Sequence, residues 1–269
     1  MLASNRVSIV VTSDKLRVYE YFPTLTAMLR QIKVPYYFVR LKDSQELIRI
    51  ICLKENIEKV KSVISNQKLV IWQNPQPYEV NYMRYGNEAV YSSVEAYFYF
   101  INKCYSKYGQ ESNLFQRYLH ILNVILHVFS IKETEYSILL ELLIDLWSEY
   151  YNISNEDLKL LEHQLNIKYN IDNQLLEKED LKMCKQYLKE IKLIINITKC
   201  PINGEFPSFS KNLREYLLKQ DFVLQQEIKL LVTLFHMTAN MFGIHSHLEI
   251  YSYLILNKGL SNNDRIYTK

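Results

Sequence analysis

Glycine and proline are scarce in this sequence, with 5 and 6 residues among 269. Few tight turns can be built from so few residues, which argues against an all-β sandwich and favours long helices. The same scarcity argues against a nucleotide site made of backbone amides. The sequence also lacks a phosphate-binding glycine loop, a Gly-x-Ser-x-Gly elbow and a His-Glu-x-x-His pair. We therefore do not expect a kinase, an ordinary ATPase or a dinucleotide oxidoreductase.

Cysteine is also rare, and the four cysteines are far apart: Cys52, Cys104, Cys184 and Cys200. None forms a Cys-x-x-Cys pair or has a histidine at zinc-ligand spacing, so we expect buried thiols, no metal and no cofactor. The sequence has no apolar run long enough to span a bilayer and no signal-peptide core near Met1. These features predict a soluble, cytoplasmic protein.

Charge is nearly balanced, because charged residues make up 23% of the chain and the net charge is +3. So small an excess does not indicate nucleic acid or a membrane surface as a partner. Tyrosine, in contrast, is abundant, with 22 residues. Tyrosine buries a large area while keeping a polar tip, so a cluster of these residues could line a cleft that receives a peptide.

The chain has two textures, which together predict an α+β fold. We expect residues 1–86 to form a small mixed or antiparallel sheet with covering helices and 87–269 to form a larger helical bundle, within one compact functional domain. In the first part we expect a hairpin and two further strands, with a helix that Pro23 kinks or breaks. The expected strands are Arg6–Thr12, Tyr36–Leu41, Glu46–Leu53 and Lys68–Gln73, and the expected helices run to about Ile32 and from Asn56 to Ser65.

Two side chains are candidates for chemistry on local sequence alone. Arg84 lies where the sheet region meets a long aromatic helix, and could clamp a carboxylate or a carbonyl of a bound peptide; it could equally be a surface arginine paired with Glu79 or Glu88. His236 lies in an apolar helical run, where it could transfer a proton in a dry pocket. The ordinary alternative for His236 is a satisfied core residue.

Four motifs in order resemble the C-terminal, elimination-type domain of lantibiotic dehydratases. They are Tyr37-Phe38-Val39-Arg40-Leu41-Lys42-Asp43, Leu47-Ile48-Arg49-Ile50-Ile51, Asn81-Tyr82-Met83-Arg84-Tyr85-Gly86 and His236-Met237-Thr238-Ala239-Asn240-Met241-Phe242-Gly243. The resemblance implies an enzyme that acts on a ribosomally made precursor peptide. Its elimination reaction removes glutamate from glutamylated serine or threonine with a base and carboxylate-binding cations.

Three departures from the family pattern change the expected reaction. The family's glutamate is Asn81 here, a strand arginine is Ile51, and the arginine after Asn240 is Met241. Asparagine is no base at neutral pH and isoleucine cannot bind a carboxylate. The sequence therefore resembles more closely the free-standing pyridine synthases of thiopeptide pathways, which use the same domain. Their reaction is a formal aza-[4+2] cycloaddition of two dehydroalanines, with loss of water and leader peptide.

This resemblance assigns roles to eight residues. His236, Arg84 and Tyr85 are the expected catalytic residues, and Arg49, Asn81, Tyr82, Arg40 and Asn240 the expected substrate-binding residues. The expected partner is a leader-bearing precursor with a dehydrated, azole-bearing core, with other pathway enzymes nearby; monomer and homodimer both stay open. One alternative is the elimination subunit of a split dehydratase, with Glu79 in place of Asn81. Another is a non-catalytic scaffold that binds the leader.

Overall fold

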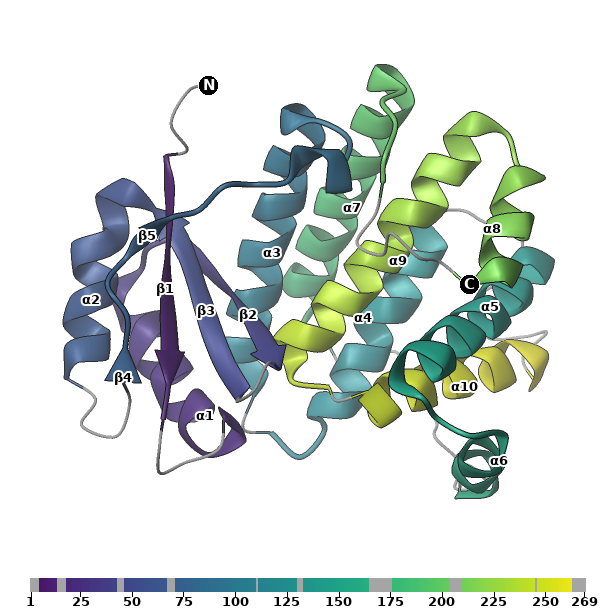
Figure 1. The fold of residues 1–269 in the computed structure, drawn as a ribbon, viewed down its shortest axis with the longest axis horizontal. Helices are drawn as coiled ribbons and strands as arrows, with labels where there is room; N and C mark the ends of the chain where they lie inside the picture. The colour runs from purple at the N-terminus through teal and green to yellow at the C-terminus, as the bar shows by residue number, and fades with distance from the viewer. Residues whose placement is uncertain are drawn as a thin grey trace.

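The structure, a computed structural model, describes residues 5–13, 18–42, 46–66, 71–109, 111–129, 133–164, 176–203, 210–244 and 246–262. Within these ranges an antiparallel sheet at the N-terminal end is followed by a helical bundle, which confirms the predicted α+β class (Figure 1). The elements are β1 (Arg6–Thr12), α1 (Val18–Leu29), η1 (Arg30–Ile32), β2 (Tyr36–Lys42), β3 (Glu46–Leu53), η2 (Lys54–Asn56), α2 (Ile57–Ser65), β4 (Ile71–Trp72), β5 (Gln76–Pro77), η3 (Tyr82–Arg84), α3 (Glu88–Tyr108), α4 (Leu114–Phe129), α5 (Glu133–Tyr151), α6 (Asn155–Gln164), α7 (Lys178–Thr198), α8 (Lys211–Leu218), α9 (Phe222–Phe242) and α10 (Ser246–Asn262).

The sheet has the order β2-β3-β1-β4, and β5 also pairs with β1. All its recorded pairings are antiparallel, and β2 and β3 form the predicted hairpin. Because side chains alternate across a strand, the register defines two faces. One face carries Phe38 opposite Ile50, and the other carries Tyr37 opposite Ile51.

Helices cover the sheet unequally. Helix α1 packs on the Phe38 face, where the rings of Phe22 and Phe38 are 4.3 Å apart. Helices α3 and α9 lie beside β2, at the edge of the sheet (Figure 1). There the Asn102 amide donates to the carbonyl of Tyr36 at 3.1 Å, so α3 supplies a hydrogen bond that a further strand would otherwise make.

The predicted elements differ from the observed ones in three places. Helix α1 continues through Pro23 without a break, and the Thr26 hydroxyl lies 3.0 Å from the carbonyls of both Phe22 and Pro23. Of the predicted strand 68–73, residues 68–70 lie outside the described ranges; β4 is Ile71–Trp72, so the strand ends one residue before the predicted Gln73. Strand β5 was not predicted, because two residues carry no alternation and one of them is proline. In the described part of the chain, every helix is too short or too polar to cross a membrane.

Candidate functional site

The Arg84-Tyr85-Gly86 motif forms the turn that leads into α3. Gly86 has φ +108°, a conformation that favours glycine, and a Cβ there would lie 2.5 Å from the sulfur of Cys200. The turn is tied to the loop after α7, because the Asn203 amide donates to the carbonyl of Met83 at 2.8 Å. Asn87 then caps α3 by accepting from the amide of Val90 at 2.9 Å. The motif thus fixes where the chain enters α3.

This turn places two tyrosines against two others, and we call Tyr37, Tyr82, Tyr85 and Tyr91 the tyrosine cluster. The ring of Tyr91 lies 5.6 Å from that of Tyr82 and 5.1 Å from that of Tyr85. The hydroxyls of Tyr37 and Tyr91 are 2.8 Å apart. Tyr82 is half-buried and the other three are buried, so Tyr82 is the member most open to a ligand. The predicted pair Tyr82 and Tyr85 therefore lies together.

A charged pair at the end of the cluster escaped sequence analysis. Arg6 on β1 binds Glu95 on α3 through two hydrogen bonds, of 2.6 Å and 2.7 Å, and its guanidinium lies 5.1 Å from the ring centroid of Tyr91. The hydrogen bond to Glu95 raises the pKa of Arg6 above its usual value. The two residues are 89 positions apart, and local sequence gives no signal for such a pair.

The pKa values of two phenols of the cluster, Tyr37 and Tyr91, are raised. Burial, followed by the charge of Glu95, raises the pKa of Tyr91 well above 10. Burial likewise raises the pKa of Tyr37, with Tyr91 as the next cause. Because Arg6 and Glu95 compensate each other, the tyrosine cluster presents an aromatic, hydrogen-bonding surface without excess charge.

Arg49 lies on the same face of the sheet as this cluster. Arg49 lies opposite Val10 on β1 and Val39 on β2. Ile51, two residues further along β3, lies opposite Tyr37. That step of two residues is about 7 Å along the strand. Arg49 is half-buried, whereas Ile51 is fully buried at 0% exposure. The structure therefore brings Arg49 close to the tyrosine cluster, and fills the position of the missing family arginine with core packing.

Arg40 and Asn240 are together, but in a structural role. The Asn240 side chain accepts from the Arg40 amide at 2.7 Å and donates to the Arg40 carbonyl at 2.8 Å, as a neighbouring strand would. The guanidinium of Arg40 lies 4.1 Å from the ring centroid of Phe22, on the face opposite Arg49. It also packs against Gly243, where an added Cβ would collide with it. These residues join α9 to β2, and their predicted contact with substrate remains untested.

His236 lies in a different setting, where α9 meets α5 and α10. Its Nδ1 is 3.3 Å from both carboxylate oxygens of Glu249 on α10. Its ring stacks on Trp147 of α5, with centroids 4.6 Å apart and planes at 18°. The histidine side chain is 19% exposed and that of Glu249 is 2% exposed. His236 is thus neither a fully enclosed core residue nor a solvated one.

The Arg84 turn and His236 mark two separate parts of the molecule. Asn81 is exposed and Arg84 is half-buried in the turn. The loop that holds this turn is bound to the start of α9, where the Ile202 amide donates to the Gln226 side chain at 2.5 Å. His236 follows Gln226 by ten residues, which is about 15 Å along the helix.

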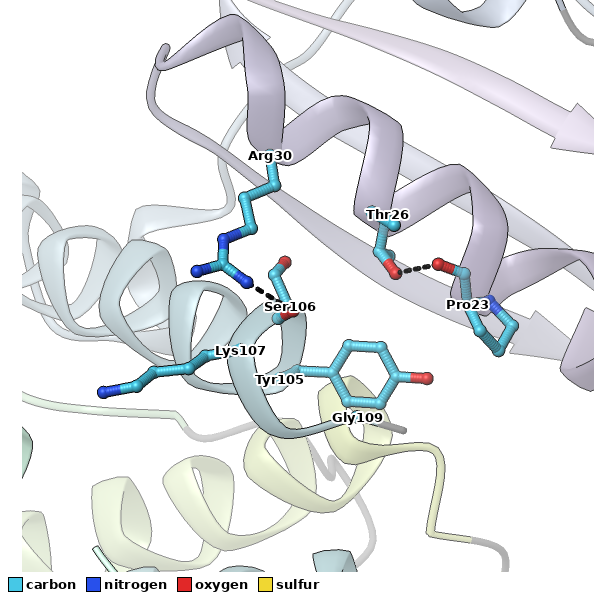
Figure 2. Close-up of a pocket in the computed structure, with 8 residues that line it drawn as sticks. Pro23, Thr26, Arg30, Tyr105, Ser106, Lys107 and Gly109 are labelled. Atoms are coloured by element: carbon cyan, nitrogen blue, oxygen red, sulfur yellow. Dashed lines mark hydrogen bonds between the residues drawn. The ribbon is translucent and has the colours of Figure 1, made fainter. Parts of the chain in front are cut away.

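A cavity of about 200 Å³ lies between α1 and the end of α3 (Figure 2). Its lining residues are Pro23, Thr26, Ala27, Arg30, Tyr105, Ser106, Lys107 and Gly109, and it includes none of the eight predicted site residues. In Figure 2 the Lys107 side chain points away from the other sticks, and Arg30 donates to the carbonyl of Ser106 at 3.3 Å. This cavity is not the site that the sequence motifs indicate.

The described ranges hold no group of three or more His, Cys, Asp or Glu side chains arranged for a metal ion. Burial raises the pKa of the Cys52 thiol to about 11 and that of Cys184 to about 12, so neither is a ready nucleophile.

The comparisons with known proteins agree with the motifs. Residues 10–260 match the family described as lantibiotic biosynthesis dehydratase, C-terminal. The chain therefore belongs to this family, a family of peptide-antibiotic biosynthesis. A search of curated proteins found no match.

Two solved structures share the fold. The tRNA-dependent lantibiotic dehydratase MibB from Microbispora sp. 107891 matches with a TM-score of 0.56 and 12% identity, over 97% of this chain and 28% of that one. The pyridine synthase TbtD from thiomuracin biosynthesis matches with a TM-score of 0.55 and 9% identity, over 96% of this chain and 98% of that one. The chain thus spans about a quarter of the dehydratase and nearly all of the pyridine synthase.

Proposed function

We propose that this protein is a cyclase of ribosomally made peptide antibiotics. It would join two dehydroalanines of a leader-bearing precursor by a formal aza-[4+2] cycloaddition, then eliminate water and the leader peptide to leave a pyridine-centred macrocycle. The observation that carries the proposal is the uncharged side chain at two positions where the family resemblance implies a charged one. Asn81 stands where the family has a glutamate, and Ile51, fully buried, stands where it has an arginine.

The surface that remains suits a dehydrated, azole-bearing peptide better than a glutamyl group. Burial raises the pKa of the Tyr91 phenol, and Arg6 and Glu95 are bound to each other. Azole rings can stack on such an aromatic surface, whereas a glutamyl carboxylate would find Arg49 there without the second strand arginine, whose position the buried Ile51 takes. Arg49 is close enough to this surface to orient peptide carbonyls, and Arg84 is the further candidate for that role.

The chemistry places modest demands on acid–base groups. A cycloaddition depends mainly on holding the two ends of one peptide in a reactive geometry. Proton transfer is needed when an amide tautomerises and when the leader leaves, and His236 is the candidate for both steps. Tyr85 is 5% exposed, so it more readily shapes the wall of the site than exchanges a proton.

The match to TbtD, which covers 98% of that chain, also favours a cyclase. The partner that we propose is therefore a precursor peptide with leader and modified core, delivered by other enzymes of the pathway. No cofactor enters this reaction scheme.

The test is mass spectrometry of two peptides incubated separately with the purified protein. A dehydrated, azole-bearing precursor that loses water and its leader supports cyclisation. A glutamylated precursor that loses glutamate would instead identify an elimination subunit, with exposed Glu79 replacing Asn81. If neither mass changes while the precursor still binds, the protein is a leader-binding scaffold.

A further inference from the structure

We infer that Glu249 is a positioning residue for His236, which fixes the proton of the imidazole on Nδ1 and leaves Nε2 as the nitrogen for proton transfer. This inference rests on the proposed function in so far as His236 acts on substrate. The pairing itself rests on geometry alone. The two residues are 13 positions apart and lie on consecutive helices, α9 and α10.

The carboxylate of Glu249 is deeply buried and held in place. The residue is 1% exposed, and the hydroxyl of Tyr253 donates to its Oε1 at 2.8 Å. An ionised carboxylate in such a place requires hydrogen bonds and a compensating positive charge. In the described part of the chain, the ion pair recorded for Glu249 is the one with His236. The carboxylate can therefore accept a hydrogen bond from the Nδ1–H group and stabilise the imidazole ring when that ring becomes positively charged.

Two buried phenols lie beside this pair. On α10 the partner is Tyr253, and on α4 it is Tyr118, whose charge interaction with Glu249 crosses the helix interface. Burial, then Glu249, raises the pKa of both phenols well above 10. Tyr151 on α5 is the further titratable group near these two phenols.

Trp147 fixes the remaining freedom of the imidazole. The indole of Trp147 is fully buried and stacks on the ring of His236. The ring of Tyr151 also stacks on this indole, with centroids 5.3 Å apart and planes at 20°. A ring that is stacked and hydrogen-bonded at one nitrogen can present only its other nitrogen to a substrate. The same arrangement of a buried carboxylate, an oriented imidazole and a proton-exchanging Nε2 is how enzymes prepare a histidine for general acid–base work.

The Glu249→Gln variant tests the inference. The glutamine amide can accept a hydrogen bond from Nδ1–H through its oxygen, or it can donate one to Nδ1 through its nitrogen and so favour the Nε2–H tautomer. The full-length protein would be labelled with ¹⁵N-histidine and studied by long-range ¹H–¹⁵N correlation at a pH where the ring is neutral. His236→Gln identifies the His236 signals. We expect the Nδ1–H tautomer in the wild type and a mixture, or the Nε2–H tautomer, in Glu249→Gln.

The matched control is Glu227→Gln, which alters another buried glutamate, 6% exposed and paired with Lys192 rather than with histidine. It should leave the His236 tautomer unchanged. In the cyclisation assay, Glu249→Gln should lower kcat by about 100-fold with KM nearly unchanged, and Glu249→Asp should restore part of the rate. Glu227→Gln should stay within a few-fold of wild type.

Two results would overturn the positioning role: a tautomer that is the same in Glu249→Gln as in wild type, or an unchanged kcat in an active enzyme. If the wild type cyclises no peptide but Glu249→Gln still changes the tautomer, the pairing holds and only the proposed function fails. The spectroscopic and kinetic results thus separate the two claims.

Discussion

The tyrosine cluster and the His236–Glu249 pair contrast in how they use their polar groups. In the cluster, Tyr37, Tyr91, Arg6 and Glu95 satisfy one another through hydrogen bonds of 2.6–3.2 Å. Such a closed network is suited to holding a surface in a fixed shape. In the pair, Nδ1 of a partly exposed imidazole is bound to a buried carboxylate.

This difference suggests a division between binding and chemistry. The cluster consists of aromatic rings beside a compensated ion pair, so it contributes area and stacking rather than protons. His236 contributes little area, but an imidazole can both accept and donate a proton. A substitution in the cluster should then change peptide binding or stability, and a substitution at His236 should change turnover.

The largest expected effect on activity comes from His236→Gln. Glutamine can still donate to Glu249 and so protect the buried carboxylate, but it cannot exchange a proton. We expect kcat of cyclisation to fall by about 100-fold or more, with peptide affinity retained. Rates from mass spectrometry and affinities from fluorescence anisotropy measure the two quantities. His127→Gln, at an exposed position on α4, is the control; equal losses in both variants would remove His236 from the mechanism.

An intermediate effect, on stability, is expected from Glu95→Ala. This change leaves the Arg6 guanidinium, whose side chain is 14% exposed, without its carboxylate. Loss of one partner of a largely buried pair should lower the free energy of unfolding by about 3 kcal/mol, measured by urea denaturation.

Glu58→Ala removes the partner of Lys61 from an ion pair of 2.9 Å whose glutamate is 77% exposed, and serves as the matched control. Its expected cost is below about 0.5 kcal/mol. Similar losses of unfolding free energy in the two variants would show that the Arg6–Glu95 pair does not stabilise the region around the tyrosine cluster.

The smallest effect is expected from Tyr82→Leu, which removes the most accessible ring of the cluster. If azole rings stack there, KM should rise by roughly 2- to 10-fold, the equivalent of one aromatic contact, with kcat unchanged. Tyr82→Phe keeps the ring and should behave like the wild type. A fall in kcat without a change in KM would contradict the division between the two regions.

The elements that sequence predicted best are those with strong local patterns. Strands β1, β2 and β3 have dense β-branched and aromatic residues, and α3 has apolar residues at helical spacing, so each was found within a few residues of its bounds. Strand β5 was missed because its two residues are defined by pairing with β1 rather than by their own pattern.

The site shows the same limit. Motif order indicated Arg84, Tyr85 and His236, and the structure groups Tyr82 with Tyr85 and places Arg49 on their face. The partners Glu95 and Glu249 could not be found, since each meets its counterpart only through tertiary packing. Arg40 shows the converse: a motif residue whose side chain the register directs to the opposite face.

The most direct measurement is a competition in one reaction. The protein is incubated with equal amounts of a dehydrated, azole-bearing precursor and a glutamylated precursor, and both are followed by mass spectrometry. We predict that the first peptide loses water and its leader while the second keeps its glutamate. Release of glutamate from the second peptide, with the first peptide unchanged, would contradict the account and identify the protein as an elimination enzyme.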